Sequence, residues 1–445
     1  MNKPSILALL LTMSGADSGI HGAVTFTGNT LPVITEQPPA STGLNDIFVI
    51  DNVRGVTAQY TGSGANTVKW YRYSAMGGGY AEEVASTQSG NLSTLSVLEG
   101  NMGYIVEDGT SRYYFWVVNY ANTPFGLVGL NISPDSDCVN TMLNPEGYGD
   151  RITYYSINGA PQTLSRDIEL SYNTLTWDND AAMYRETETV STYPYLSGAI
   201  HAPAPLCNTE FHLSGDKFMR TWGVAEEISS VYYVTPAVSA TTSAEQSVRE
   251  IDNEKDPGNG GSLGGSAPCE IRFSATTTDA AIYREWQFST DPDFVNLTNR
   301  YNELDVTYTF REQGTTYVRF MASNDAGSCD WYSETYQVNI GESALECPNA
   351  FSPGSTEGIN DEWKVSYKSI ISFECHIFNR WGQKMAELTD PSQGWDGRYH
   401  GKLVPAGVYF YVIKATGSDG KEYKLNGDIN IINFKDNRRT SSDIQ

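Results

Sequence analysis

Near its end the chain reads Pro348-Asn349-Ala350-Phe351-Ser352-Pro353, then Asn360-Asp361, Phe378-Asn379-Arg380-Trp381-Gly382, Trp395-Asp396-Gly397 and Pro405-Ala406-Gly407-Val408-Tyr409. Runs of aromatic and β-branched residues, such as Ile371 to Phe378 and Val408 to Ile413, alternate with these motifs and predict strands. Asp396-Gly397 and Asp419-Gly420 supply the positive φ angles that tight turns need. We therefore predict that residues 347–433 form a small β-sandwich.

These motifs, in this order and at the C-terminus, resemble the gliding-motility-associated C-terminal domain, which is the type B sorting domain of the type IX secretion system of Bacteroidota. The resemblance implies an Ig-like sandwich that the type IX secretion machinery recognises at the outer membrane. The protein would then pass through the periplasm and be secreted or held on the outer cell surface. Residues 434–445 would form a tail beyond the domain. By resemblance, the sorting motif consists of Pro348, Asn349, Phe351, Pro353, Asn360, Asp361, Asn379, Arg380, Trp381, Gly382, Trp395, Asp396, Gly397, Pro405, Gly407 and Tyr409.

The rest of the chain differs from this C-terminal stretch in its charge. From Cys347 onward, twelve Asp and Glu residues balance eight Lys and four Arg residues, so the whole net charge of −24 falls on residues 1–346. Those residues contain only four lysines. We therefore predict no nucleic-acid partner, because nucleic-acid binding requires a basic face. An acidic surface instead favours solubility in an extracellular setting.

The N-terminus, residues 1–23, resembles a secretory signal peptide. Lys3 precedes the apolar run Ile6 to Leu11, and small residues follow, so that cleavage near Ala16 and cleavage near Ala23 both remain open. No other apolar stretch approaches the ~18 residues of a membrane-spanning helix, and we predict no transmembrane span.

The remaining sequence predicts an all-β protein of tandem sandwiches, because short alternating runs recur between clusters of Gly, Asn, Asp and Ser. Residues 24–135 are typical of an Ig-like sandwich, with Trp70 on an inner strand. Residues 136–236 predict a second β-rich domain, with a sandwich as the default and Phe218 to Trp222 among its strands. Residues 267–341 have the pattern of an Ig-like or PKD-like sandwich.

The segment 237–266 differs in composition from the modules on either side. It begins rich in Ser, Ala and Thr and ends in the glycine-rich run from Pro257 to Ser266. This composition predicts a flexible linker. The glycine-rich run lacks the Gly-Lys-Ser/Thr end of a phosphate-binding loop, so we do not interpret it as a ligand site.

Six cysteines in an exported protein favour disulfides, because the periplasm is oxidising. The sequence alone does not determine which cysteines pair. Spacing and domain seams suggest one bridge per module: Cys138 with Cys207, Cys269 with Cys329, and Cys347 with Cys375.

The sequence carries none of the common catalytic signatures, such as His-Glu-x-x-His or Gly-x-Ser-x-Gly, and we predict no catalytic residues and no cofactor. Two segments could hold a metal ion. One contains His201, Cys207, Glu210 and His212, but a disulfide at Cys207 would remove its thiolate. The other, Ser289 to Phe294, could ligate calcium, but it resembles a capped turn more closely. We therefore predict no metal site.

Three functional interpretations follow. The favoured one is a non-enzymatic secreted or cell-surface protein that acts in adhesion, ligand binding or scaffolding, with an unknown extracellular protein or glycan as partner. A secreted hydrolase with an unrecognised active site in residues 136–236 is the second. A carbohydrate-binding surface protein is the third, and it would show a flat strip of exposed aromatic rings, for which Trp177 and Trp222 are the candidates.

Overall fold

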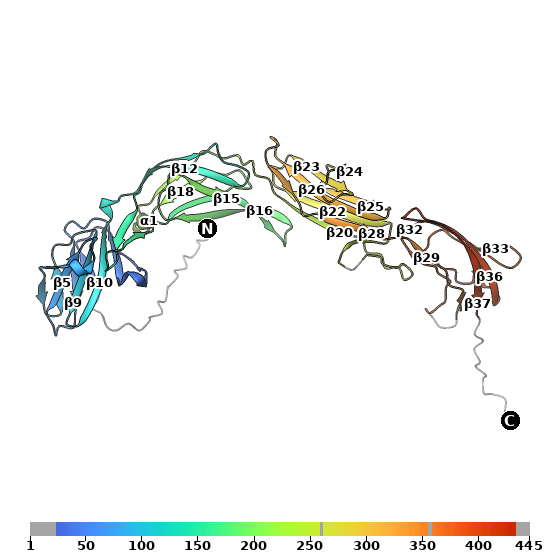
Figure 1. The fold of residues 1–445 in the computed structure, drawn as a ribbon, viewed down its shortest axis with the longest axis horizontal. Helices are drawn as coiled ribbons and strands as arrows, with labels where there is room; N and C mark the ends of the chain where they lie inside the picture. The colour runs from blue at the N-terminus through green and yellow to red at the C-terminus, as the bar shows by residue number, and fades with distance from the viewer. Residues whose placement is uncertain (1–23, 259–260, 355–357, 433–445) are drawn as a thin grey trace, which may run out of the picture. The chain divides into compact units, whose positions relative to one another are not determined.

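The computed structural model describes residues 24–258, 261–354 and 358–432, so the predicted signal peptide and tail lie outside the described residues. Within these ranges the chain forms 37 strands and one α-helix, α1 (Lys217–Trp222), which makes it an all-β protein, as predicted (Figure 1). The chain divides into two compact units. The first holds the residues up to Thr174 together with Glu186–Val234, and the second holds Leu175–Arg185 together with the residues from Thr235 onward.

The first unit begins with a sandwich of two sheets. Trp70 is fully buried and donates a hydrogen bond from Nε1 to Ser93 Oγ at 3.0 Å, so the inner strand predicted around this tryptophan is present. One sheet has the order β1 (Val24–Thr27), β4 (Thr57–Thr61), β8 (Leu92–Leu95), β7 (Thr87–Ser89); the other has the order β2 (Ile34–Glu36), β3 (Asp46–Ile50), β10 (Ser111–Asn119), β9 (Met102–Asp108), β5 (Val68–Tyr73), β6 (Glu82–Val84).

Strands β3 and β10 of the second sheet, which pair in parallel, are buried on both faces. Every residue from Ile47 to Ile50 and from Phe115 to Val118 is buried. Successive side chains of a strand point to opposite faces. Phe115 accordingly packs in the core of the first sandwich, whereas Trp116 belongs to a hydrophobic cluster that continues into the second module. The first two modules therefore share a continuous core.

The second module contains three small sheets and α1. Residues Phe218 to Trp222 form this helix, so the prediction of a strand there is wrong. Asp216 caps the helix by accepting hydrogen bonds from two backbone N–H groups of its first turn, and Gly223 ends it at a φ of 73°. The sheets have the orders β11 (Gly126–Ile132), β12 (Asn140–Tyr148), β17 (Ile200–Pro203); β13 (Ile152–Tyr155), β14 (Pro161–Leu164); and β16 (Met183–Tyr193), β15 (Ile168–Asp178), β18 (His212–Gly215), β19 (Glu226–Ser229).

The second unit begins with the predicted third sandwich. Trp286 and Phe288 are buried on one face of β23, as the sequence predicts, and Phe273 of the opposite sheet packs against both rings. One sheet has the order β20 (Ala240–Gln246), β22 (Cys269–Thr277), β25 (Asp305–Phe310); the other has the order β21 (Leu263–Gly265), β28 (Tyr336–Ile340), β26 (Gly314–Ser323), β23 (Tyr283–Ser289), β24 (Leu297–Tyr301), with β27 (Asp330–Tyr332) paired to β26.

The prediction of a flexible linker over residues 237–266 is wrong for most of its described part. Strand β20 pairs with β22 along its whole length, and β21 pairs with β28. Between them, Asn253 donates from Nδ2 to the carbonyls of Val365 at 2.7 Å and Pro391 at 2.8 Å. The polar composition that suggested a linker here supplies hydrogen bonds to the following domain.

The C-terminal domain is a β-sandwich, as predicted. Its buried core includes Trp363, Cys375, Ile377, Ile413 and Ile429. The main sheet has the order β30 (Ala350–Phe351), β37 (Glu422–Ile431), β36 (Gly407–Gly417), β32 (Ile370–Phe378), β33 (Lys384–Leu388); two short pairs are β29 (Ala344–Glu346) with β31 (Ser366–Lys368), and β34 (Arg398–Tyr399) with β35 (Lys402–Leu403).

Candidate functional site

Three aromatic rings of the predicted sorting motif pack together inside the C-terminal domain. The ring of Trp395 lies 5.6 Å from that of Phe351 and 5.2 Å from that of Tyr409, measured between centroids. All three side chains are buried. The Tyr409 hydroxyl donates to the Pro405 carbonyl at 3.0 Å, and Trp363 Nε1 donates to the Pro348 carbonyl at 2.7 Å. These motif residues hold the sandwich together.

Two further segments of the motif form turns, and the residue types at these positions suit the geometry of the turns. The Asp361 carboxylate accepts hydrogen bonds from the backbone N–H groups of Gly354 at 2.9 Å and Gly358 at 2.7 Å. Gly397 has a φ of 72°, and a Cβ atom there would lie 3.1 Å from Pro353 Cγ. A side chain at Gly397 would therefore be strained both by its backbone conformation and by its neighbours.

The Asn379 turn is different, because it presents side chains to solvent. Asn379 Oδ1 accepts hydrogen bonds from the backbone N–H groups of Trp381 and Gln383, both at 3.0 Å, and Gly382 adopts a φ of 80°. This geometry leaves Trp381 75% exposed. The Arg380 guanidinium stacks on the indole ring at 4.2 Å from its centroid. A large exposed tryptophan is a typical anchor for a protein partner.

A hollow of about 490 Å³ lies beside Trp381. Two motifs that are separated in the sequence meet there, and neither motif alone indicated the hollow. Its motif residues are Asn379, Arg380, Trp381, Pro405, Gly407 and Tyr409.

The predicted disulfide pairings are wrong. Cys138 and Cys329 are each in a disulfide, but the structure does not form the predicted bridges to Cys207 and Cys269. Cys347 and Cys375 pack in the same core but are both thiols. Burial, with a smaller contribution from Cys347, raises the pKa of the Cys375 thiol to about 12.

Among the described residues, neither of the two segments considered for a metal ion brings its side chains together as a ligand set. Asp291 accepts hydrogen bonds from three backbone N–H groups, those of Asp293, Val295 and Asn296, at 2.9 to 3.2 Å, which is the geometry of a capped turn. His212 lies on β18 with Nδ1 2.8 Å from Ser229 Oγ, whereas His201 lies on β17 in another sheet.

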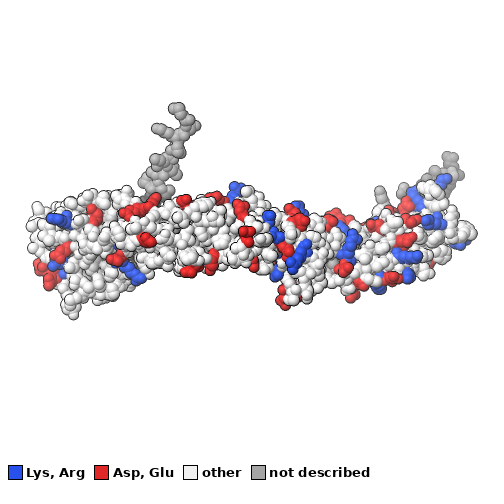
Figure 2. Space-filling model, turned by 90° about the horizontal axis from the view of Figure 1, so that it is seen from above, with Lys and Arg blue, Asp and Glu red and all other residues white. Residues whose placement is uncertain are grey.

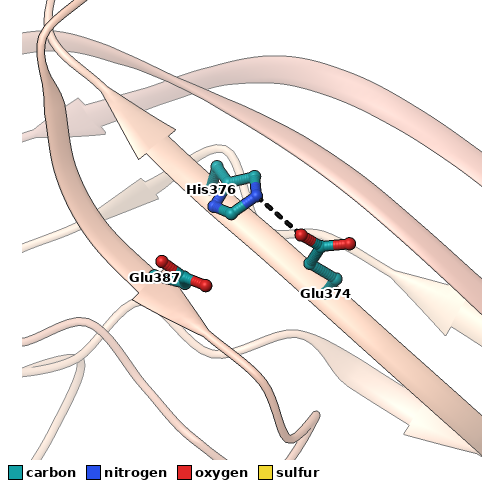
Figure 3. Close-up of side chains that lie close together, drawn as sticks. All are labelled: Glu374, His376 and Glu387. Atoms are coloured by element: carbon teal, nitrogen blue, oxygen red, sulfur yellow. Dashed lines mark hydrogen bonds and ion pairs between the residues drawn. The ribbon is translucent and has the colours of Figure 1, made fainter.

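A group that the sequence analysis missed lies on the C-terminal domain. Glu374, His376 and Glu387 place one potential ligand atom each within 4.8 Å of the others (Figure 3). The Glu-x-His spacing of Glu374 and His376 on β32 is visible in the sequence. Glu387 could not be assigned to the group from the sequence, because it lies on β33 and its position depends on the pairing of the two strands.

The second module has a polar hollow of about 690 Å³. Tyr232 lines this hollow and is 61% exposed. Val231 and Val234, near it in the sequence, are 74 and 67% exposed. Side chains around the hollow include Tyr172, Glu186, Glu188, Glu210, His212 and Tyr232.

Charged side chains are mixed on the C-terminal domain. Figure 2 shows Lys and Arg side chains interspersed with Asp and Glu there, in agreement with the neutral balance of this part of the sequence. In the described part of the chain, no helix is long and apolar enough to cross a lipid bilayer.

Comparison with known families identifies two parts of the chain. Residues 345–431 match the family described as CHU_C Type IX secretion signal domain, and residues 131–230 match the fibronectin type III domain family described as Fn3_FA. The chain is therefore a multi-domain β-sandwich protein that carries a type IX secretion signal. It is exported across the outer membrane, either to the cell surface or into the medium.

Solved structures of tandem β domains are similar to the chain only at a coarse level. A tetra-tandem repeat in the extending region of a large adhesion protein is 13% identical and has a TM-score of 0.22; the similarity covers 92% of this chain and 100% of that chain. The FN1-FN3 domains of chicken CNTN1 are 12% identical, with a TM-score of 0.22 and coverage of 69% and 99%. Scores this low carry no argument about function. No curated protein matches the sequence.

Proposed function

We propose that the protein is a non-enzymatic surface or secreted protein whose upstream modules bind an extracellular protein or glycan, in adhesion or scaffolding. The observation that carries the proposal is the polar hollow of the second module, which the exposed side chain of Tyr232 lines. Val231 and Val234, close to Tyr232 in the sequence, are exposed as well. Adjacent apolar side chains on a surface are typical of interaction sites. The type IX secretion signal delivers this surface to the outside of the cell.

The shared core of the first two modules supports the same proposal. Binding loops and sheet faces work best on a rigid scaffold, because their side chains then lose little conformational entropy on binding. The matched families and the fold are of the Ig and fibronectin type rather than of an enzyme.

The aromatic strip expected of a carbohydrate-binding surface does not include Trp222. This residue lies in α1, donates from Nε1 to the Pro32 carbonyl at 2.7 Å and packs against the Tyr120 ring at 5.1 Å. At the hollow, a glycan ligand would contact tyrosine side chains, among them Tyr232.

Binding of the purified chain to an immobilised oligosaccharide array and to an immobilised peptide array tests the proposal. We expect saturable binding on one array that weakens more than tenfold in Tyr232→Ala. Tyr148→Ala is the matched control, because Tyr148 is 55% exposed on β12 and does not line the hollow. Absence of binding on both arrays would contradict the proposal, and cleavage of the immobilised sugars would favour the hydrolase instead.

A further inference from the structure

The outer face of the C-terminal sheet brings together an imidazole and two carboxylates. On β32, Cys375 and Ile377 point into the core, so Glu374 and His376 point outward on the same face. Glu387 of β33 is the residue directly opposite His376 in the antiparallel pairing. Figure 3 shows the imidazole lying between the two carboxylates.

The geometry of this group points to a metal ion rather than to a simple ion pair. His376 Nε2 lies 2.9 Å from Glu374 Oε1, and the potential ligand atoms of all three residues lie within 4.8 Å of one another. Ligand atoms around a tetrahedral Zn²⁺ are about 3.3 Å apart, given Zn–N and Zn–O distances near 2.0 Å. Small rotations of the two exposed glutamate side chains would bring the ligand atoms from within 4.8 Å of one another to the separation of about 3.3 Å that Zn²⁺ requires.

The second ring nitrogen of His376 gives an independent indication. His376 Nδ1 is shielded from solvent and has no hydrogen-bond partner among the described residues. An orphaned polar atom is unfavourable. The hydrogen bond to Glu374 therefore leaves the ring incompletely satisfied, and a ligand that reorients the imidazole could relieve this.

We propose that Glu374, His376 and Glu387 form a binding site for one divalent transition-metal ion, of which Zn²⁺ is the representative. One imidazole and two carboxylates are ligands that Zn²⁺ accepts, whereas Ca²⁺ prefers oxygen ligands alone. Both glutamates are exposed, so the remaining coordination position is open to solvent.

Lys384 competes with the ion for one ligand. Its ammonium lies 2.6 Å from the Glu387 carboxylate, and both side chains are about half exposed. A cation on Glu387 must displace this ammonium. Removing the lysine charge should therefore tighten metal binding, an effect that a purely structural ion pair does not predict.

Titration calorimetry of the chelator-treated full chain with ZnCl₂ tests the site. We expect one saturable site that weakens at least tenfold in His376→Gln and in Glu387→Gln and tightens several-fold in Lys384→Gln. Glu422→Gln is the matched control, because Glu422 is exposed on the same domain and pairs with Lys424 at 2.8 Å.

A parallel titration with CaCl₂ should show no saturable site that depends on His376. The thermal midpoint of each variant without metal confirms that it folds. Equal Zn²⁺ affinity in the wild type, His376→Gln and Glu387→Gln would overturn the proposal. A response to Ca²⁺ as strong as that to Zn²⁺ would do the same, because it would show that the carboxylates act without the imidazole.

Discussion

The guanidinium of Arg166 and the carboxylate of Asp216 form an ion pair in which neither side chain has any solvent exposure. Asp216 also caps α1 and accepts a hydrogen bond from the Tyr120 hydroxyl at 3.0 Å. Arg166 Nε donates to the Asp150 carbonyl at 2.8 Å. Burial, and next the negative charge of Asp216, raise the pKa of Tyr120. The pair therefore joins the end of the first module to the second.

Replacing Arg166 by methionine should destabilise the first unit by about 3–5 kcal/mol, because the Asp216 carboxylate would stay buried without a partner charge. Native-state hydrogen exchange of the peptides around Tyr120 measures the change. Arg112→Met is the control: its ion pair with Glu107 has the arginine 57% exposed, so solvent screens the pair and its loss should change the exchange much less. Equal effects of the two substitutions would show that the buried ion pair stabilises the first unit no more than an exposed ion pair does.

The sequence predicted the sandwiches where the local pattern was complete. Trp70 stands in a run that alternates between buried and exposed residues at Val68, Lys69 and Trp70, and such a pattern depends only on the strand itself. Trp286 instead begins a run of four buried residues that ends at Ser289. The C-terminal domain was predictable from its turns and aromatic residues. The continuous apolar runs Ile47 to Ile50 and Phe115 to Val118 carry a further signal, because strands buried on both faces have this composition.

What the sequence did not predict depends on contacts between distant segments. The partner of Arg166 is 50 residues away along the chain. The group around His376 needs the register of β32 with β33, which includes an irregularity next to Phe378. The docking of Asn253 depends on carbonyl groups more than 100 residues later. The local composition of residues 237–266, which suggested a linker, contains no information about such distant partners.

Substitutions of Trp381 and Trp395 should distinguish an effect on export from an effect on folding. Trp381→Ala should change the free energy of unfolding by less than about 0.5 kcal/mol, because the side chain is 75% exposed, and yet lower the fraction of the protein that reaches the cell surface. Trp395→Ala should cost about 3–5 kcal/mol, because a buried ring is lost. Cell fractionation and thermal midpoints measure the two effects. Normal export of Trp381→Ala alongside the exposed control Val412→Ala would contradict a recognition role.

Asn253→Ala should loosen the segment between β20 and β21 from the C-terminal domain. The substitution leaves the carbonyls of Val365 and Pro391 without their donor, at a cost of about 1–3 kcal/mol for each buried group. Hydrogen exchange at residues 365–367 should become faster. Asn302→Ala, at an exposed position in the same unit, should leave it unchanged. Unchanged exchange in Asn253→Ala would show that these two hydrogen bonds do not hold the segment against the C-terminal domain.

Asp291 should make the loop after β23 sensitive to acid. Its hydrogen bonds, first that from the Asn296 N–H, lower the pKa of the carboxyl below its ordinary value of 3.8. A group with a lowered native pKa stabilises the fold fully above its unfolded pKa and loses this effect as the pH falls through its native pKa. Asp291→Asn should therefore speed exchange in residues 289–296 at pH 7, and the difference from the wild type should shrink below about pH 4. Asp293→Asn, an exposed change of the same charge, is the control, and an equal effect of both substitutions would exclude the capping role.

Cys375 should resist alkylation in the folded protein. With its pKa raised to about 12 by burial, and further by Cys347, only about one thiol in ten thousand is ionised at pH 8, and the thiolate is the reacting species. Mass spectrometry after iodoacetamide treatment should find Cys375 unmodified in the native protein and fully modified in guanidinium chloride. Rapid native modification would mean that the core around Cys375 opens readily. Protection that persists in denaturant and disappears on reduction would show that the exported protein bridges Cys375, as its sequence suggested, since only a covalent bond protects a thiol once the core has unfolded.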